Sequence, residues 1–219
     1  MTLSPIPLRV LGALIEKEIT TPEAYPLSLN ALINACNQRS SRDPVLDLDE
    51  EQVRQGLHTL EDLELATPVR DTRVPKYEHR ARTVFNLRRD ETAVLCLLLL
   101  RGPQTSGELR SRADRLFTFD DLAAVQSTLD RLARREQPAS DAADDLTGPL
   151  TILLPRQPGS REARYMHLLG GPPALNVIPV QSASASPNRL ANLETELAEI
   201  RIRIALMEAR LTTLESEGR

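Results

Sequence analysis

Residues 49–87, DEEQVRQGLHTLEDLELATPVRDTRVPKYEHRARTVFNL, predict a helix followed by a β ribbon. Asp49, with Gln52 three residues later, has the spacing of a capping box, which marks the start of a helix. The buried stripe of this helix is expected at Val53, Leu57, Leu60 and Leu63. Two prolines then keep any strand pairing short. Strand-favouring side chains follow at Tyr77, Val84 and Phe85. We therefore expect residues 66–87 to form two strands around a long turn.

Two further helices are expected upstream of this segment. The first begins at Ser4-Pro5, because serine caps helices and proline suits the first helical position. Its apolar face is formed by Val10, Leu11, Leu14 and Ile15. The second helix begins after Ser28 as its cap, and the polar turn 37–44 follows it. Its inner face is formed by Leu29, Leu32, Ile33 and Cys36.

The same order of elements then occurs a second time. Residues 90–100 predict a strongly apolar helix that ends at Gly102-Pro103. Residues 105–108 are a second capping box and open a short helix. Its buried residues are expected to be Leu109, Ala113 and Leu116. Thr118 is expected to cap a third helix. The stripe of that helix is Leu122, Val125, Leu129 and Leu132. A hairpin over residues 150–169 completes the copy.

Three helices closed by a two-stranded ribbon, present twice with about 80 residues per copy, indicate an internal duplication. This is the layout of a winged helix, a variant of the helix-turn-helix. An unrelated pair of small α+β domains would show the same periods and is the open alternative. The expected fold is mainly α (α+β), with two tandem winged-helix domains plus a C-terminal coiled-coil helix. The first domain covers residues 1–88 and the second covers residues 89–170.

The amino-acid composition and the hydrophobic pattern of the chain change after the second copy. Residues 171–188 contain prolines and a Ser/Ala run, which is typical of a flexible linker. Residues 189–217 predict a coiled-coil helix, because apolar residues alternate there at spacings of three and four. The seam consists of Leu190, Leu193, Leu197, Ile200, Ile204, Met207, Leu211 and Leu214. A parallel arrangement brings opposite charges together in the pairs Glu196–Arg201, Arg203–Glu208 and Arg210–Glu215. We therefore expect a parallel homodimer; a helix folded back on its own domain and higher oligomers are the alternatives.

Composition excludes several classes of function. The 219 residues carry a formal charge of −4, and all but two of the 27 cations are arginine. This excludes a uniformly basic nucleic-acid coat but allows local basic patches. Aromatic residues make up only 3%, which argues against base-stacking platforms and sugar-binding clefts. The sequence has no signal-peptide layout and no apolar run near the roughly 20 residues of a membrane-spanning helix. We therefore expect a cytoplasmic protein that does not contact a membrane.

No constellation of residues predicts catalysis. His58, His79 and His167 belong to different expected elements and have no nucleophile or paired carboxylate at a motif spacing. The chain has no Gly-rich phosphate loop. Cys36 and Cys96 lie in apolar surroundings, which favours core packing over a reactive or metal-binding thiol. We therefore expect no enzyme activity, no metal and no cofactor.

Several short motifs carry a family resemblance. They are EKE at 16–18, TTPE at 20–23, YPLSLN at 25–30, ACNQRSSR at 35–42, PV at 44–45 and KYEHR at 76–80. With these motifs the chain resembles the YceH-like family of bacterial proteins over roughly residues 1–170, and most specifically over residues 16–45. The resemblance implies a tandem of winged-helix domains. It implies no catalytic or binding residues, because the function of that family is uncharacterised.

The candidate DNA-contacting residues follow from their expected places in a helix-turn-helix. Its third helix enters the major groove, where Gln and Arg can pair with base edges. Here that helix carries six acids against one arginine, which repel phosphates. Residues 66–89 carry seven cations against two acids, which suits phosphate or minor-groove contacts as well as a solvated hairpin. The turn 37–42 either contacts the DNA backbone or fixes the turn itself. The candidates are Asn37, Gln38, Arg39, Arg42, Gln52, Arg54, Gln55, Arg73, Lys76, Arg80 and Arg82.

Two functions are consistent with these patterns. The first is a non-enzymatic DNA-binding protein, a dimeric transcriptional regulator whose partner is double-stranded DNA. The alternative is a tandem winged-helix adaptor that mediates protein–protein interaction, which the acidic third helix and the net negative charge favour.

Overall fold

The computed structural model describes residues 2–69, 74–135, 148–157 and 159–172. Residues 1–173 form one compact unit. Most of the expected linker and the whole heptad seam lie outside the described residues, so the coiled coil and the dimer stay predictions.

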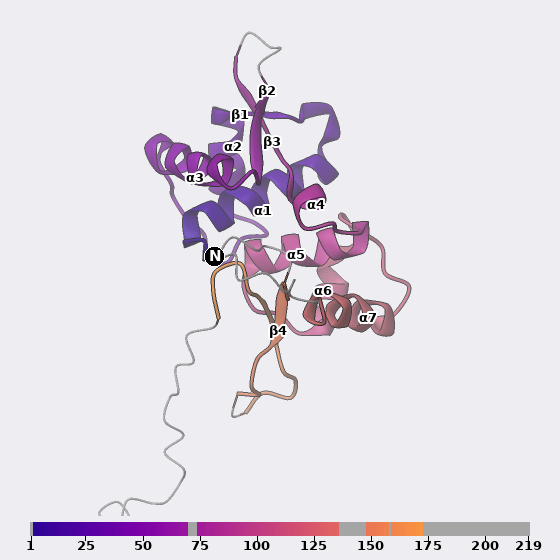
Figure 1. Ribbon diagram of the computed structural model, residues 1–219. Coiled ribbons are helices and arrows are strands. Elements are labelled where there is room, and N and C mark those ends of the chain that lie inside the picture. The colour runs from indigo at the N-terminus through magenta and orange to yellow at the C-terminus, as the bar shows by residue number, and fades with distance from the viewer. Residues whose placement is uncertain (1, 70–73, 136–147, 158, 173–219) are drawn as a thin grey trace, which may run out of the picture. The chain divides into compact units, whose positions relative to one another are not determined.

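The first half of this unit consists of three helices and a small sheet (Figure 1). The helices are α1 (Pro5–Thr20), α2 (Leu29–Cys36) and α3 (Glu50–Asp62), with the 3-10 turn η1 (Pro22–Ala24) after α1. The strands are β1 (Leu27–Ser28), β2 (Ala66–Val69) and β3 (Lys76–His79). They pair antiparallel in the order β1-β3-β2. The expected caps at Ser28 and Asp49 are confirmed, because Ser28 Oγ accepts from Ala31 N and Asp49 Oδ1 accepts from Gln52 N. Ser4 lies at the N-cap position of α1, but its side chain forms no cap hydrogen bond. Strand β1 was not expected.

The expectation that strand continues through residues 84–85 is wrong. The pairing ends at His79, and α4 (Ala81–Val84) follows as a short helix. Turn bonds from Val84 N to Arg80 O and from Phe85 N to Ala81 O fold the chain inward. The physical reason is tertiary: this turn places Phe85 fully in the core, which a continued strand would not.

The second half repeats the order of three helices and a hairpin. The helices are α5 (Arg89–Arg101), α6 (Ser106–Ala113) and α7 (Leu122–Ala133), and the strands are β4 (Thr151–Leu153) and β5 (Tyr165–His167). The capping box at Thr105 and Glu108 is confirmed. The expected cap at Thr118 is wrong: Asp121 caps α7 by accepting from Ala124 N, which leaves Leu122 48% exposed. Before this start, Phe117 packs edge-to-face on Phe119.

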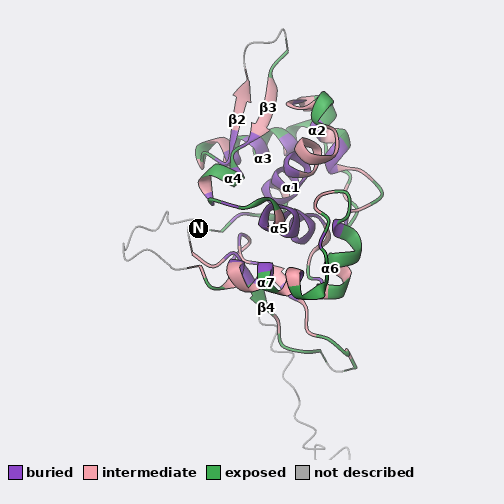
Figure 2. Cartoon of the chain, turned by 90° about the vertical axis from the view of Figure 1, so that its right-hand side faces the viewer, coloured by how far each residue is buried: buried purple, intermediate pink, exposed green. Residues whose placement is uncertain are grey.

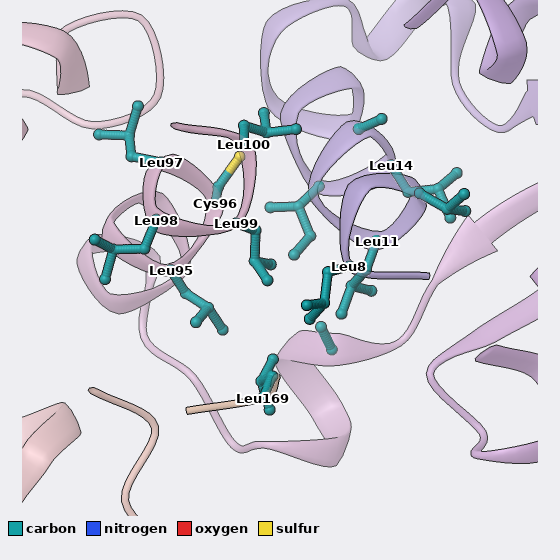
Figure 3. Packing of buried hydrophobic residues seen from close by; sticks show 14 of the residues in the cluster. Leu8, Leu11, Leu14, Leu95, Cys96, Leu97, Leu98, Leu99, Leu100 and Leu169 are labelled. Carbon is teal, nitrogen blue, oxygen red and sulfur yellow. The ribbon is translucent and has the colours of Figure 1, made fainter. Parts of the chain in front are cut away.

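Both halves share one continuous hydrophobic core. Helices α1 and α5 lie at its centre, and both are buried along most of their length (Figure 2). Figure 3 shows Leu8 and Leu11 of α1 and Leu99 of α5 in the space between the two helices. The two helices approach closely at Gly12, whose carbonyl accepts a hydrogen bond from Cys96 Sγ at 3.5 Å. The expected domain boundary at residues 88/89 therefore falls just before a helix that packs against the first half.

The expected class, mainly α with small β sheets, is confirmed by these elements. Their order is the one that tandem winged helices require, and the winged-helix assignment itself stays a prediction. Among the described helices, none combines the length and the apolar character needed to cross a membrane.

Candidate nucleic-acid interface

The three α3 residues expected to read bases contact their own helix. Gln52 Oε1 accepts from Asp49 N and so completes the cap. Arg54 Nη2 donates to Glu50 Oε1 at 2.5 Å, and Gln55 Nε2 donates to Glu51 Oε1 at 3.0 Å. All of these contacts are exposed, and exposed ion pairs contribute only about 0–1 kcal/mol. The face of α3 thus presents neutralised side chains and spare acids rather than free cations.

The turn 37–42 is held by contacts within the chain. Asn37 forms two hydrogen bonds of 2.8 Å with the backbone of Leu48, and Gln38 accepts from Lys17 Nζ at 3.1 Å. These contacts fix the connection into α3, which is the structural alternative that the sequence left open. In this turn Arg39 is exposed.

Arg42 is a buried structural residue. Its side chain is 0% exposed, and Nη1 and Nη2 donate to the two carboxylate oxygens of Glu16 at 3.1 and 2.6 Å. Two further bonds run to the carbonyl of Ala35. A guanidinium so enclosed has no face for a phosphate, so its expected DNA contact is not supported by this position.

Exposed, unpaired cations gather instead where the ribbon leads into α5. Arg80 and Arg82 flank the start of α4, and Arg88 and Arg89 lie at the start of α5. We call these four residues the basic cluster. All four are exposed, and among the described residues none of their guanidinium groups has a hydrogen bond or an ion pair. Lys76 lies in β3 and is half-buried, and Arg73 falls outside the described residues.

Arg88 and Arg89 lie beside two acids at the start of α5. A helix N-terminus carries partial positive charge and favours acids. The acids of this turn, Asp90 and Glu91, are engaged by Arg131 of α7, with 3.2 Å between Arg131 Nε and Glu91 Oε1. Glu91 also caps this end of α5, because its Oε2 accepts from Arg88 N at 2.9 Å. The guanidinium groups of Arg88 and Arg89 remain exposed beside these engaged acids.

Two members of the basic cluster line the same cavity. Arg82 and Arg89 border a cavity of about 320 Å³ together with Glu18, Thr92 and Leu116. The cavity thus collects groups from α1, α4, α5 and the turn after α6, and the chain segments that carry Arg82 and Arg89 are held side by side.

The base of the ribbon is fixed to α1 by a contact that the sequence did not predict. His79 Nε2 lies 2.9 Å from Glu18 Oε2, while His79 Nδ1 accepts from Ala81 N. His79 N also donates to Tyr25 Oη at 2.7 Å. The hydrogen bond to His79 lowers the pKa of Glu18, which keeps that carboxylate ionised. This contact positions α4, and with it Arg80 and Arg82, against the end of α1.

The remaining titratable groups have structural surroundings. Cys36 and Cys96 are both buried, and burial raises the pKa of Cys36 to about 12, so neither position favours a reactive thiolate. Burial lowers the pKa of His167 to about 4 and keeps that ring neutral. Within the described ranges no group of three His, Cys, Asp or Glu side chains could hold a metal ion.

Comparison with known proteins shows which sequences the chain is similar to. Residues 3–160 match the family model described as "Protein of unknown function, DUF480". A UPF0502 protein of Koribacter versatilis is 51% identical over 206 residues, which cover 91% of each chain. A UPF0502 protein of Solibacter usitatus is 47% identical over 203 residues, covering 89% of this chain and 90% of the relative. A UPF0502 protein of Aeromonas hydrophila is 44% identical over 226 residues, covering 98% of this chain and 99% of the relative.

Proposed function

The chain belongs to the DUF480 family of proteins of unknown function, and we propose that it is a non-enzymatic protein that binds double-stranded DNA through its basic cluster. Membership of an uncharacterised bacterial family is what the motifs at residues 16–45 and 76–80 indicated. The observation that carries the proposal is that Arg80, Arg82, Arg88 and Arg89 are exposed and unpaired among the described residues.

The chemistry of the basic cluster suits phosphates better than bases. Exposed guanidinium groups bind phosphate oxygens through charged, often bidentate hydrogen bonds. Such contacts supply affinity and orientation without reading sequence. The segment from Lys76 to Arg89 carries five cations against Glu78 alone, whereas the first turn of α3 is acidic. In this proposal the basic cluster therefore holds the DNA backbone, and Arg54 and Gln55 reach bases only by exchanging their partners on α3.

The regulator is proposed to act as a dimer through the heptad seam at residues 190–214. That part of the proposal rests on the sequence pattern and on the three opposite-charge pairs of the parallel arrangement. At saturation, we therefore expect two chains bound per DNA duplex.

Reversing two charges of the basic cluster is expected to weaken DNA binding strongly. In Arg80→Glu/Arg82→Glu, two phosphate contacts become repulsive, so affinity should fall by about 10- to 100-fold at about 50 mM salt. The slope of log K against log salt should become shallower by about 2 for each chain bound, because each chain loses two phosphate contacts. Fluorescence anisotropy with random and genomic duplexes at about 50 and about 200 mM salt measures both quantities.

The matched control reverses two arginines on the other hairpin. Arg156 and Arg161 are exposed in the β4–β5 hairpin, at the opposite end of the described unit from β2 and β3 (Figure 1). Arg156→Glu/Arg161→Glu changes the net charge equally and should retain most of the affinity. Equal losses in both double variants would contradict the location, and no binding of the wild type at the lower salt would contradict DNA binding itself.

The acidic surface of α3 favours a second candidate, the adaptor that binds another protein. Glu51 and Asp62 are exposed on this helix, and the side chain of His58 is 76% exposed between them. A basic segment of a partner protein fits this surface. A protein partner that co-purifies equally with the wild type and with Arg80→Glu/Arg82→Glu, without DNA, would favour the adaptor over the regulator.

A further inference from the structure

A second, smaller cavity lies where the two halves of the unit meet. It has a volume of about 50 Å³ and is bordered by α1, the turn after α2, the end of α5 and the residues around α6. Its cationic lining consists of Lys17, Arg101, Arg112 and Arg115. Glu16 is the one carboxylate among its described lining residues. We call this cavity the anion pocket.

The single carboxylate does not neutralise these four cations. Both carboxylate oxygens of Glu16 already accept hydrogen bonds from the guanidinium group of Arg42, at 2.6 and 3.1 Å. Lys17 Nζ is 3.8 Å from Glu16 Oε2 and hydrogen-bonds Gln38 instead. Arg112 directs one nitrogen to Gln104 and lies 3.7 Å from Glu108. The local charge of the pocket therefore remains positive.

Arg101 has a buried hydrogen-bond donor without an acceptor. Its Nη2 donates to Ser41 Oγ at 2.7 Å, but its Nε is buried without a hydrogen-bond partner. Burial lowers the pKa of Arg101, and the charges of Arg112 and Arg42 lower it further, only partly offset by Glu16 and Asp43. Arg115 is exposed and has no ion pair or hydrogen bond among the described residues. An incoming oxyanion would relieve both the repulsion and the missing hydrogen bonds.

We propose that the anion pocket binds one small tetrahedral oxyanion of the phosphate class. The pocket volume of about 50 Å³ exceeds the roughly 10–15 Å³ that one water molecule needs, so there is room for a small ion. The cationic residues of the pocket come from α1, the end of α5, α6 and the turn after α6. Ammonium and guanidinium groups are the usual protein donors to phosphate oxygens. Lys17, Gln38 and Ser41 belong to the densest resemblance motif at residues 16–45, which the proposed DNA contact does not use. The site does not depend on the proposed function.

Binding of inorganic phosphate to the full chain tests this site. Isothermal titration calorimetry should show one phosphate per chain, and saturating phosphate should raise the melting temperature by about 2–4 °C relative to chloride at equal ionic strength. Lys17→Met and Arg115→Ala each remove one charged donor without emptying the core, and each should weaken phosphate binding by about tenfold or more.

The matched control is Arg110→Ala, an exposed arginine of α6 that does not line the pocket. This variant should bind phosphate as the wild type does. Absence of saturable phosphate binding by the wild type, or equal weakening in Arg110→Ala, would overturn the proposal. Because Arg115 is exposed, Arg115→Ala should stay folded, and its melting temperature without phosphate verifies this.

A competition experiment identifies the source of the oxyanion. If the phosphate belongs to a DNA backbone, a short duplex should displace inorganic phosphate, and Arg115→Ala should weaken duplex binding too. If the ligand is a free anion, phosphate and duplex should bind independently. Failure of the DNA titration with retained phosphate binding separates this site from the proposed function.

Discussion

Replacing Arg42 with methionine is expected to lower the free energy of unfolding by about 3–4 kcal/mol. The substitution keeps much of the apolar volume of the Arg42 side chain, but it leaves the carboxylate of Glu16 without its bidentate partner. It also removes both donors to the carbonyl of Ala35. Breaking a buried pair on one side is costly because the remaining charge is left uncompensated. Urea denaturation followed by circular dichroism measures the change.

Arg39→Met, three positions earlier in the same turn, is the control. Arg39 is exposed, so its replacement should change the free energy of unfolding by no more than about 0.5 kcal/mol. If Arg42 served DNA rather than the fold, Arg42→Met would weaken DNA binding and leave stability almost unchanged. A stability loss below about 1 kcal/mol would therefore contradict the structural role.

Replacing Gly12 with valine is expected to lower the free energy of unfolding by about 2–3 kcal/mol. A β-carbon at Gly12 would lie 2.9 Å from Leu100 Cδ2 and 3.1 Å from Leu99 Cβ, so α1 and α5 would have to separate. Because one core spans both halves, the melting temperature of the whole unit should fall by about 5–10 °C in a single transition. Differential scanning calorimetry measures both the shift and the number of transitions.

Gly107→Val provides the same substitution in a helix with open space. The nearest atom to a β-carbon at Gly107 is Thr105 Oγ1 at 3.8 Å. The melting temperature of this variant should stay the same or rise slightly, since valine has the better helix propensity. Two separate transitions in Gly12→Val, one of them at the wild-type temperature, would show that the halves do not share a core.

Local signals in the sequence predicted the elements, and distant contacts explain the errors. The capping boxes at Asp49 and Thr105 act over three residues, so their spacing alone predicts the helix starts. The short helix α4 depends on the placement of Phe85 in a core built by other segments. The role of Arg42 depends on Glu16, 26 positions away, which no local pattern reports.

The sequence predicted the charge of the candidate interface but not which of its cations are unpaired. The excess of cations over residues 66–89 pointed to the region that contains the basic cluster. Which cations are free depends on tertiary pairing: Arg131 engages Asp90 and Glu91, and so leaves Arg88 and Arg89 without the acids next to them in sequence. The anion pocket depends on tertiary packing in the same way, because Lys17 and Arg115 line one cavity only after α1 and α6 have both packed on α5.

Hydrogen–deuterium exchange of the full chain with and without a saturating DNA duplex tests the central claim most directly. If the basic cluster binds DNA, amide protection on DNA binding should concentrate at residues 80–92, which cover α4 and the first turn of α5. The face of α3 and the β4–β5 hairpin should change little. No protection anywhere, or protection confined to α3 or to that hairpin, would contradict the claim that the basic cluster holds the DNA.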